Sequence, residues 1–230
     1  MTTIASNLQS VRERIARACA AAARDVNEVT LLPVSKTFGP DAVRAAYAAG
    51  ETAFGENYIQ EAVDKQALLA DLPLQWHCIG PIQSNKTRLV AAHFDWAQSV
   101  DRLKIAQRLS EQRPEGLPPL QVCIQVNIDG GPTKAGVAPD EALALAREVA
   151  RLPRLQLRGL MTIPEPSEEY AAQLAVHRRA RALFDALCDT GLQLDTLSMG
   201  MTADLEAAIH AGSTMVRVGT AIFGTRAKRA

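Results

Sequence analysis

One apolar run of the chain reads Val29-Thr30-Leu31-Leu32-Pro33-Val34-Ser35-Lys36 and ends on a lone lysine. A run of this length predicts a buried strand. An amine that emerges from a buried strand is a candidate Schiff-base nucleophile, because desolvation lowers its pKa and frees the neutral form. Most lysines at strand ends are simply exposed to solvent, so Lys36 by itself does not indicate a functional site.

Strand-like and helix-like segments alternate on both sides of this run. Eight short strands are predicted, at Thr30–Ser35, Thr52–Phe54, Gln75–Ile79, Trp96–Ser99, Gln121–Asn127, Gln156–Thr162, Thr196–Ser198 and Met215–Val218. Helix-period segments fill most of the gaps, among them Asp41–Ala49, Tyr58–Leu69, Arg102–Glu111, Pro139–Arg151, Tyr170–Leu187 and Ala203–Ala211. This alternation indicates right-handed βαβ units and a parallel sheet. Eight units favour a closed (β/α)8 TIM barrel, and an open doubly wound sheet is the alternative.

The N-terminal part adds a helix that the barrel does not need. Apolar residues at helical spacing predict this amphipathic helix from about Ile4 to Arg24. No linker or internal repeat interrupts the rest of the chain. We therefore expect one domain over 1–230, with the extra helix at 4–24 and the barrel at 29–224.

Composition excludes several classes of protein. Lys+Arg and Asp+Glu both number 25, so no global charge favours nucleic acid or an anionic membrane. The four cysteines lie far apart without a CxxC pair, which is typical of reduced, mostly buried thiols rather than a disulfide or zinc framework. The N-terminus lacks a signal-peptide pattern, and no apolar stretch has the length of a membrane helix. We expect a soluble, cytoplasmic protein.

Candidate functional residues gather where the predicted strands end, which is where a barrel carries its site. Lys36 ends the first strand. After the last strand comes a glycine-rich, hydroxyl-bearing stretch that includes Gly219-Thr220 and predicts a phosphate cradle at a helix start. An aldehyde-binding amine and a phosphate cradle together suggest pyridoxal 5'-phosphate (PLP).

The alternation of side chains along a strand predicts that two cationic side chains point into the barrel. Val216 and Val218 suit the layer between sheet and helices, which turns Arg217 inward, and Lys36 shares the inward face of its strand. Two inward cations leave room for an anionic or acceptor-rich ligand. The alternative is a structural ion pair of Arg217 with Asp195 or Glu56.

Several long segments carry a family resemblance over essentially the whole chain. They are VSKT at Lys36, FGENYIQE at 54–61, WHCIGPIQSNK at 76–86, RGLMTI at 158–163, LSMGMTADLEAAI at 197–209 and GSTMVRVGTAIFG at 212–224. In order and spacing they resemble the pyridoxal phosphate homeostasis protein family. The resemblance implies the barrel of the alanine racemase N-terminal domain, covalently bound PLP and a role in vitamin B6 balance without a known turnover reaction.

The resemblance also implies roles for single residues. Lys36 resembles the lysine that forms the aldimine, and Arg217 resembles the arginine that faces the pyridine nitrogen. The remaining expected cofactor-binding residues are Asn57, His77, Met161, Ser198, Gly219 and Thr220, of which Ser198, Gly219 and Thr220 match the phosphate positions. His77 as a satisfied core histidine and Met161 as barrel filling remain alternatives. Phe38 departs from relatives that carry a second lysine there, which puts a PLP exchange scheme using that amine in doubt.

The expected chemistry is weak. An arginine cannot accept the ring-nitrogen proton that makes PLP a strong electron sink. The chain also leaves no length for the second domain that supplies a racemase with its second acid/base, so we expect negligible racemase activity. We expect a monomeric PLP carrier or buffer whose partners are PLP and PLP-dependent apoenzymes, with no nucleic acid, membrane or metal. A racemase working from the barrel alone and a cofactor-free Schiff-base aldolase are the alternatives.

Overall fold

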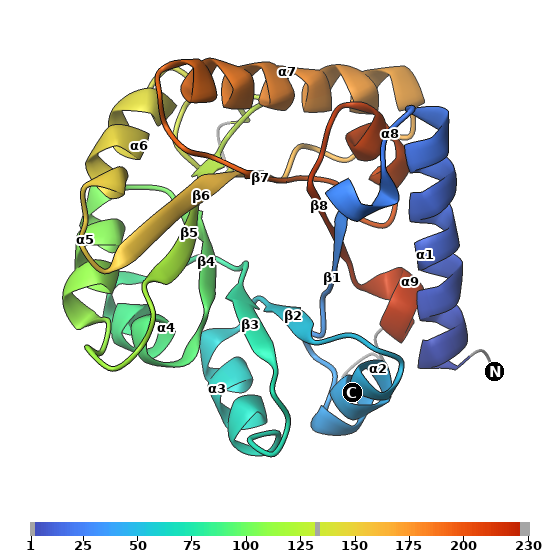
Figure 1. Cartoon of the computed structure of the whole chain (residues 1–230), viewed down its shortest axis with the longest axis horizontal. Helices are drawn as coiled ribbons and strands as arrows, with labels where there is room; N and C mark the ends of the chain where they lie inside the picture. Colours follow the sequence, from blue (N-terminus) through green and yellow to red (C-terminus); the bar gives the residue numbers. More distant parts are fainter. Residues whose placement is uncertain (1–2, 132–133, 226–230) are drawn as a thin grey trace.

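The computed structural model describes residues 3–131 and 134–225 of the chain. Strands ring the centre of the molecule and helices lie outside them (Figure 1). The strands are β1 (Thr30–Pro33), β2 (Ala53–Glu56), β3 (Gln75–Cys78), β4 (Trp96–Val100), β5 (Leu120–Val126), β6 (Leu155–Thr162), β7 (Thr196–Ser198) and β8 (Met215–Val218). The α-helices are α1 (Ile4–Ala21), α2 (Pro40–Ala48), α3 (Ile59–Ala67), α4 (Thr87–His93), α5 (Leu103–Gln112), α6 (Ala142–Ala150), α7 (Tyr170–Asp189), α8 (Leu205–His210) and α9 (Thr220–Phe223), with short 3₁₀ turns at Val26–Glu28 and Ser84–Lys86.

The sheet is parallel, and its strands follow one another in chain order. The pairing runs β1-β8-β7-β6-β5-β4-β3-β2. Between β1 and β2, Val34 forms a bridge with Gly55, and the N–H of Ser35 donates to Gly55 O at 3.0 Å. These contacts bring the two edges together into a nearly closed barrel. The barrel prediction is confirmed, because an open doubly wound sheet would place the first strand in its middle rather than between the second and the last.

The two faces of the strands follow the predicted parity. Val216 and Val218 belong to the large apolar cluster between strands and helices. Met215 instead belongs to a small cluster with Leu32, Val34 and Ile79 inside the barrel. The alternation of side chains along a strand therefore puts Arg217 on the inner face, as predicted.

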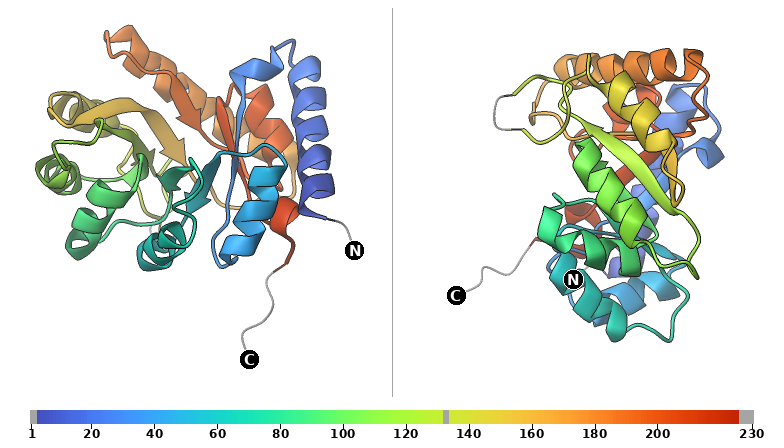
Figure 2. Two further views of the ribbon diagram at one scale, coloured as in Figure 1. Left: turned by 60° about the horizontal axis from the view of Figure 1, so that its bottom comes forward. Right: turned by 90° about the vertical axis from the view of Figure 1, so that its left-hand side faces the viewer.

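The extra N-terminal helix is present and packs beside the last elements of the barrel (Figure 2). The amide of Asn7 donates to Ile222 O at 2.8 Å, and Arg14 donates to both carboxylate oxygens of Glu206 at 2.8 and 2.9 Å. The helix ends at Ala21, three residues before the predicted end. The reason is local, since Ala23 adopts a left-handed φ of +53°, which a continuing helix does not allow.

Other predicted elements differ from the observed ones by a few residues at their ends. The largest strand difference is β2, which is predicted at Thr52–Phe54 and runs from Ala53 to Glu56. Helix α4 is missing from the prediction. It spans seven residues, Thr87–His93, directly after a short 3₁₀ turn.

The cysteine prediction is confirmed, since Cys19, Cys78 and Cys123 are buried, Cys188 is half-buried, and all four are free thiols. Within the described ranges, no group of histidine, cysteine and carboxylate side chains is arranged to hold a metal ion. No helix in the described part of the chain combines the length and apolar character that crossing a membrane requires.

Candidate functional site

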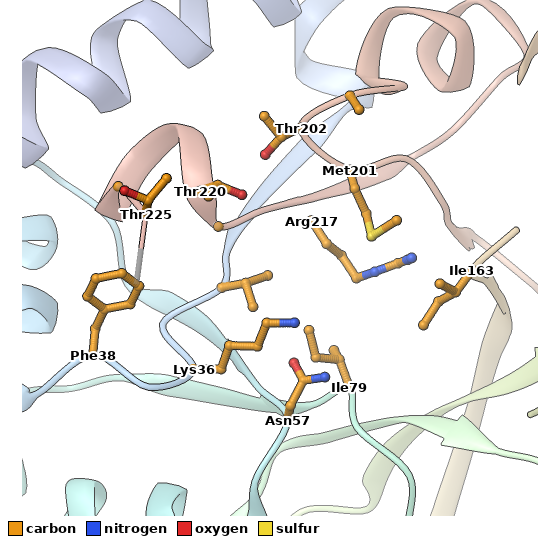
Figure 3. Close-up of a pocket in the computed structure, with 14 residues that line it drawn as sticks. Lys36, Phe38, Asn57, Ile79, Ile163, Met201, Thr202, Arg217, Thr220 and Thr225 are labelled. Carbon is orange, nitrogen blue, oxygen red and sulfur yellow. The ribbon is translucent and has the colours of Figure 1, made fainter. Parts of the chain in front are cut away.

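A cavity of about 520 Å³ opens at the carboxyl ends of the strands. Side chains that follow six of the eight strands surround it (Figure 3). Its lining residues are Val34, Lys36, Phe38, Asn57, Ile79, Ile163, Met201, Thr202, Ala203, Arg217, Gly219, Thr220, Gly224 and Thr225. The structure therefore brings five of the eight predicted site residues together: Lys36, Asn57, Arg217, Gly219 and Thr220.

Lys36 stands just beyond the end of β1 and points its amine into the cavity (Figure 3). The next residue, Thr37, has a φ of +67°, a left-handed conformation that is costly for a residue other than glycine. Its N–H donates to a carboxylate oxygen of Glu61 on α3 at 2.7 Å. The backbone on the far side of Lys36 is thus tied to the neighbouring helix.

A buried ion pair holds the backbone on the near side of Lys36. The amine of Lys65 on α3 donates to Glu56 Oε1 at 2.6 Å and to the carbonyl of Ser35 at 2.9 Å. The hydroxyl of Ser35 donates to the same Glu56 oxygen at 2.6 Å. All three side chains are buried, and burial raises the pKa of Glu56 against the effect of Lys65. We call Ser35, Glu56 and Lys65 the β1 clamp.

Arg217 is 3% exposed and projects from β8 into the same cavity (Figure 3). Its Nη1 donates to the hydroxyl of Ser198 at 2.7 Å and its Nη2 to the carbonyl of Thr162 at 2.7 Å. Burial lowers the pKa of Arg217 to about 10, so the guanidinium stays charged at neutral pH.

The alternative of a structural ion pair for Arg217 is wrong. Glu56 pairs with Lys65, and Asp195 pairs with Arg158 at 2.6 Å. Among the ion pairs of the described residues, Arg217 has no carboxylate partner within 4 Å. Its donors beyond Ser198 and Thr162 are available to a ligand with an acceptor atom.

Hydroxyl groups line the side of the cavity away from Asn57 (Figure 3). Gly219 is the N-cap of α9 and Thr220 is its first residue, and the first N–H groups of a helix have no partner within it. Thr202 faces them from the segment after β7. Hydroxyl groups and unpaired N–H groups around one space can all donate hydrogen bonds to a phosphate.

Asn57 lies between Lys36 and Ile79 on the rim of the cavity (Figure 3). Its side-chain oxygen is buried and has no hydrogen-bond partner in the described part of the chain. Its backbone is packed against Gly80, where an added Cβ would come within 2.1 Å of Asn57 O. An unpartnered polar atom at a cavity wall indicates a place for a ligand group.

The other three predicted site residues lie outside the lining. Ile79 and Ile163 line the cavity, whereas His77 and Met161 precede them by two residues on the same strand faces and lie one layer deeper. Ser198 is also fully buried, and its hydroxyl donates to Gln98 Oε1 at 2.7 Å while it accepts from Arg217. Direct cofactor contacts by these three residues stay a prediction.

His77 has the surroundings of a satisfied core histidine. Its ring stacks on Trp96 at 5.0 Å, and its two nitrogens contact Gln75 and Gln98 at 3.1 and 2.9 Å. Burial lowers the pKa of His77 to about 3, so the ring is neutral at physiological pH.

Sequence reasoning missed two features of the lining. Thr202 lines the cavity and lies inside the LSMGMTADLEAAI segment. A hydroxyl soon after a predicted strand end is a feature from which a place in the site can be predicted. Phe38 lines the cavity and stacks on Phe223 of α9 with ring centroids 5.2 Å apart. That pairing joins opposite ends of the chain, so no local pattern reveals it.

Comparisons with known proteins agree on one group of relatives. The family described as "Alanine racemase, N-terminal domain" matches residues 6–227. The pyridoxal phosphate homeostasis protein of Pseudomonas aeruginosa is 63% identical over 226 residues, covering 98% of this chain and 97% of its own. The protein of that name from Escherichia coli K12 is 53% identical over 229 residues, covering 98% of each chain.

Solved structures give the same grouping. PipY of Synechococcus elongatus, solved with PLP bound, superposes with a TM-score of 0.84 at 38% identity, over 96% of this chain and 100% of PipY. An alanine racemase of Clostridium difficile reaches a TM-score of 0.71 at 15% identity, over 94% of this chain and 56% of the racemase. The second likeness shows the fold alone.

Proposed function

Because this chain belongs to the pyridoxal phosphate homeostasis protein family, built on the alanine racemase N-terminal domain, we propose that it binds PLP at Lys36 and takes part in intracellular PLP homeostasis. In this proposal it is a cytoplasmic, monomeric carrier or buffer that supplies PLP-dependent apoenzymes. The relative solved with PLP bound and the names of the curated relatives support the cofactor and the role.

The observation that carries the proposal is the convergence of Lys36, Arg217 and Thr220 on one cavity. An amine suits the aldehyde of PLP, hydroxyl and N–H donors suit its phosphate, and a guanidinium suits an unprotonated ring nitrogen. The unpartnered oxygen of Asn57 leaves one polar contact for a ligand to fill. The residues present therefore fit PLP in both charge and hydrogen bonding.

Each side chain has a separate task in this proposal. Lys36 would hold the aldehyde carbon as a Schiff base, and Gly219, Thr220 and Thr202 would hold the phosphate. Arg217 would donate to the ring nitrogen and keep it unprotonated. When bound, PLP supplies electron withdrawal, which is weakest when its ring nitrogen carries no proton.

The lining also explains why we propose binding without significant turnover. Among the described lining residues, Lys36 and Arg217 carry the only titratable side chains. Racemisation needs a base on each face of the substrate carbon, and an arginine that stays protonated at neutral pH is a poor one. The described lining thus offers one base where two are needed.

Absorbance titration with PLP tests the proposal. The wild type should acquire visible Schiff-base absorbance that borohydride removes, and Lys36→Ala should lose it. Lys104→Ala, which removes an exposed lysine of α5, should behave like the wild type. Equal absorbance in Lys36→Ala and the wild type would contradict the assignment of Lys36.

Incubation with L-alanine or L-serine followed by chiral analysis tests the absence of turnover. Rapid formation of the D-isomer by the PLP-loaded protein would favour a racemase instead. A cofactor-free aldolase would stay colourless, and borohydride would trap its lysine only in the presence of a carbonyl substrate.

A further inference from the structure

A continuous row of polar side chains runs beneath the cavity, from the exposed Gln75 at the start of β3 through the barrel interior to Arg217 on β8. Barrel interiors are usually filled by layers of branched apolar residues. Here Gln75, His77, Gln98, Ser198 and Arg217 are joined by hydrogen bonds of 3.1, 2.9, 2.7 and 2.7 Å in that order. Gln98 and Ser198 are 0% exposed, so water cannot replace a hydrogen-bond partner that either side chain loses. We call these five residues the polar row.

The direction of every hydrogen bond in the polar row is fixed from its upper end. Arg217 can only donate, so Ser198 Oγ accepts from it and gives its own hydrogen to Gln98 Oε1. The amide nitrogen of Gln98 then donates to His77 Nδ1. That leaves the proton of His77 on Nε2, where it reaches Gln75 Oε1.

Gln98 is the residue on which this order depends. If its amide were turned over, its nitrogen would face Ser198, and the buried hydroxyl hydrogen of Ser198 would lose its acceptor. In the structure the Gln98 oxygen accepts the hydrogen of Ser198, so the Ser198 hydroxyl keeps one orientation and its lone pair faces Arg217. Ser198 and the carbonyl of Thr162 then anchor both Nη atoms of Arg217 and fix the plane of the guanidinium.

We propose that Gln98 is a positioning residue that acts through Ser198 to aim Arg217 at the ring nitrogen of bound PLP. This inference depends on the proposed function. A hydrogen bond weakens steeply as its angle departs from linear, so a guanidinium without this support donates less well. Gln98 does not line the cavity, and the proposal requires no direct contact between Gln98 and PLP.

The test uses Gln98→Leu, with Gln125→Leu as a matched control. Gln125 is also a buried glutamine of the barrel, but its amide donates to Ala135 O and takes no part in the polar row. The readouts are the dissociation constant of PLP and the ¹⁵N resonance of ring-labelled PLP bound to each protein. The resonance reports the hydrogen bond to the ring nitrogen, which a general loss of stability does not move.

We expect Gln98→Leu to shift the ring-nitrogen resonance and to weaken PLP binding roughly tenfold, as for one impaired charge-assisted hydrogen bond. Gln125→Leu should leave the resonance unchanged. Because Gln98 acts through Ser198, adding Gln98→Leu to Ser198→Ala should weaken binding little further.

Three results would overturn the inference: an unchanged resonance in Gln98→Leu, the same shift in Gln125→Leu, or additive effects of Gln98→Leu and Ser198→Ala. If Gln98→Leu does not fold, Ser198→Ala decides, since an unchanged resonance in that variant also overturns the inference. Failure of the wild type to bind PLP would overturn the proposed function as well, which distinguishes the two failures.

Discussion

Arg217 places a full positive charge inside the barrel, where it is anchored by one hydroxyl and one carbonyl. Those neutral acceptors compensate only part of the cost of removing a guanidinium from water. Lys36 adds the amine of a second basic side chain to the same cavity. At the scale of single residues, the site is therefore prepared for a ligand that brings acceptor atoms and negative charge, and PLP does so.

Replacement of Thr220 by valine tests the phosphate end of the site at nearly constant volume. We expect Thr220→Val to weaken PLP binding by about 1–3 kcal/mol, as for a lost hydrogen bond to a charged group. The measurement is fluorescence or absorbance titration with PLP. Thr190→Val, which removes a hydroxyl from the end of α7, is the control. Equal affinity of Thr220→Val and the wild type would remove Thr220 from the site.

His77 should make the protein less stable in acid. The unfolded chain binds a proton on His77 below pH 6.5, whereas the folded protein does so only near pH 3. Between these values the unfolded state holds more protons, so stability falls as the pH falls. From pH 7 to pH 4.5 the loss from this residue is about 2–3 kcal/mol.

Urea unfolding of the wild type and His77→Gln at several pH values measures this effect. Subtracting one curve from the other cancels the carboxylates that titrate in both proteins. The difference in unfolding free energy should shrink by the stated amount between pH 7 and pH 4.5. A constant difference would show that His77 is accessible to protons in the folded state.

At the scale of elements, the loop after β1 depends on α3 for its position. Lys65 and Glu61 on that helix hold the backbone on either side of Lys36, and Glu56 at the end of β2 completes the β1 clamp. The clamp secures a loop that includes the left-handed Thr37. It thereby transmits the rigidity of a strand and a helix to the lysine.

Removal of Lys65 should destabilise the fold strongly. Lys65→Met leaves Glu56 buried without its cation, which costs about 3–5 kcal/mol at neutral pH. Without Lys65 the folded pKa of Glu56 lies still further above its ordinary value of 4.5. The folded variant then binds more protons than the unfolded chain above pH 4.5. Its loss of unfolding free energy relative to the wild type should therefore grow from pH 5 to pH 7.

Urea unfolding of Lys65→Met and of the double variant Glu56→Gln, Lys65→Met measures this loss. The double variant buries no unpaired charge and should recover part of the stability with no such pH dependence. A loss below about 1 kcal/mol in Lys65→Met, typical of an exposed pair, would mean that water reaches the clamp.

The elements also show how far the sequence could predict this protein. The periods of two and of about 3.6 residues are local, so they predicted the alternating elements, the inward faces of Lys36 and Arg217, and the edge where Asn57 and Thr220 meet. The β1 clamp and the polar row join side chains by contacts across the barrel, such as Ser198 with Gln98, 100 residues away. No single-sequence pattern carries that information. Strand β7 has only three residues, too few to fix how deep Ser198 lies.

At the scale of the whole molecule, the strands ring the centre and helix α1 packs along one flank of the barrel, beside α8 and α9 (Figure 1). The lining residues run from Val34 to Thr225, so both ends of the described chain contribute to one site. Binding at such a site should stabilise the whole fold, because the unfolded chain cannot bring these segments together.

PLP should therefore raise the melting temperature of the protein. At a free concentration of about 100 times the dissociation constant, PLP stabilises the folded state by about 2.7 kcal/mol. For a chain of this size that corresponds to roughly 5–10 °C. Differential scanning calorimetry of the wild type and Lys36→Ala measures it, and the variant should show a much smaller rise. The same rise in both proteins would place the stabilising site elsewhere.

Mass spectrometry of the protein reduced with borohydride in the presence of PLP, after proteolysis, locates the lysine that carries the cofactor. We expect the pyridoxyl group on the peptide that contains Lys36, at close to one group per chain. A label on exposed lysines such as Lys104 with Lys36 unmodified would contradict the central claim, that Lys36 holds PLP inside the barrel.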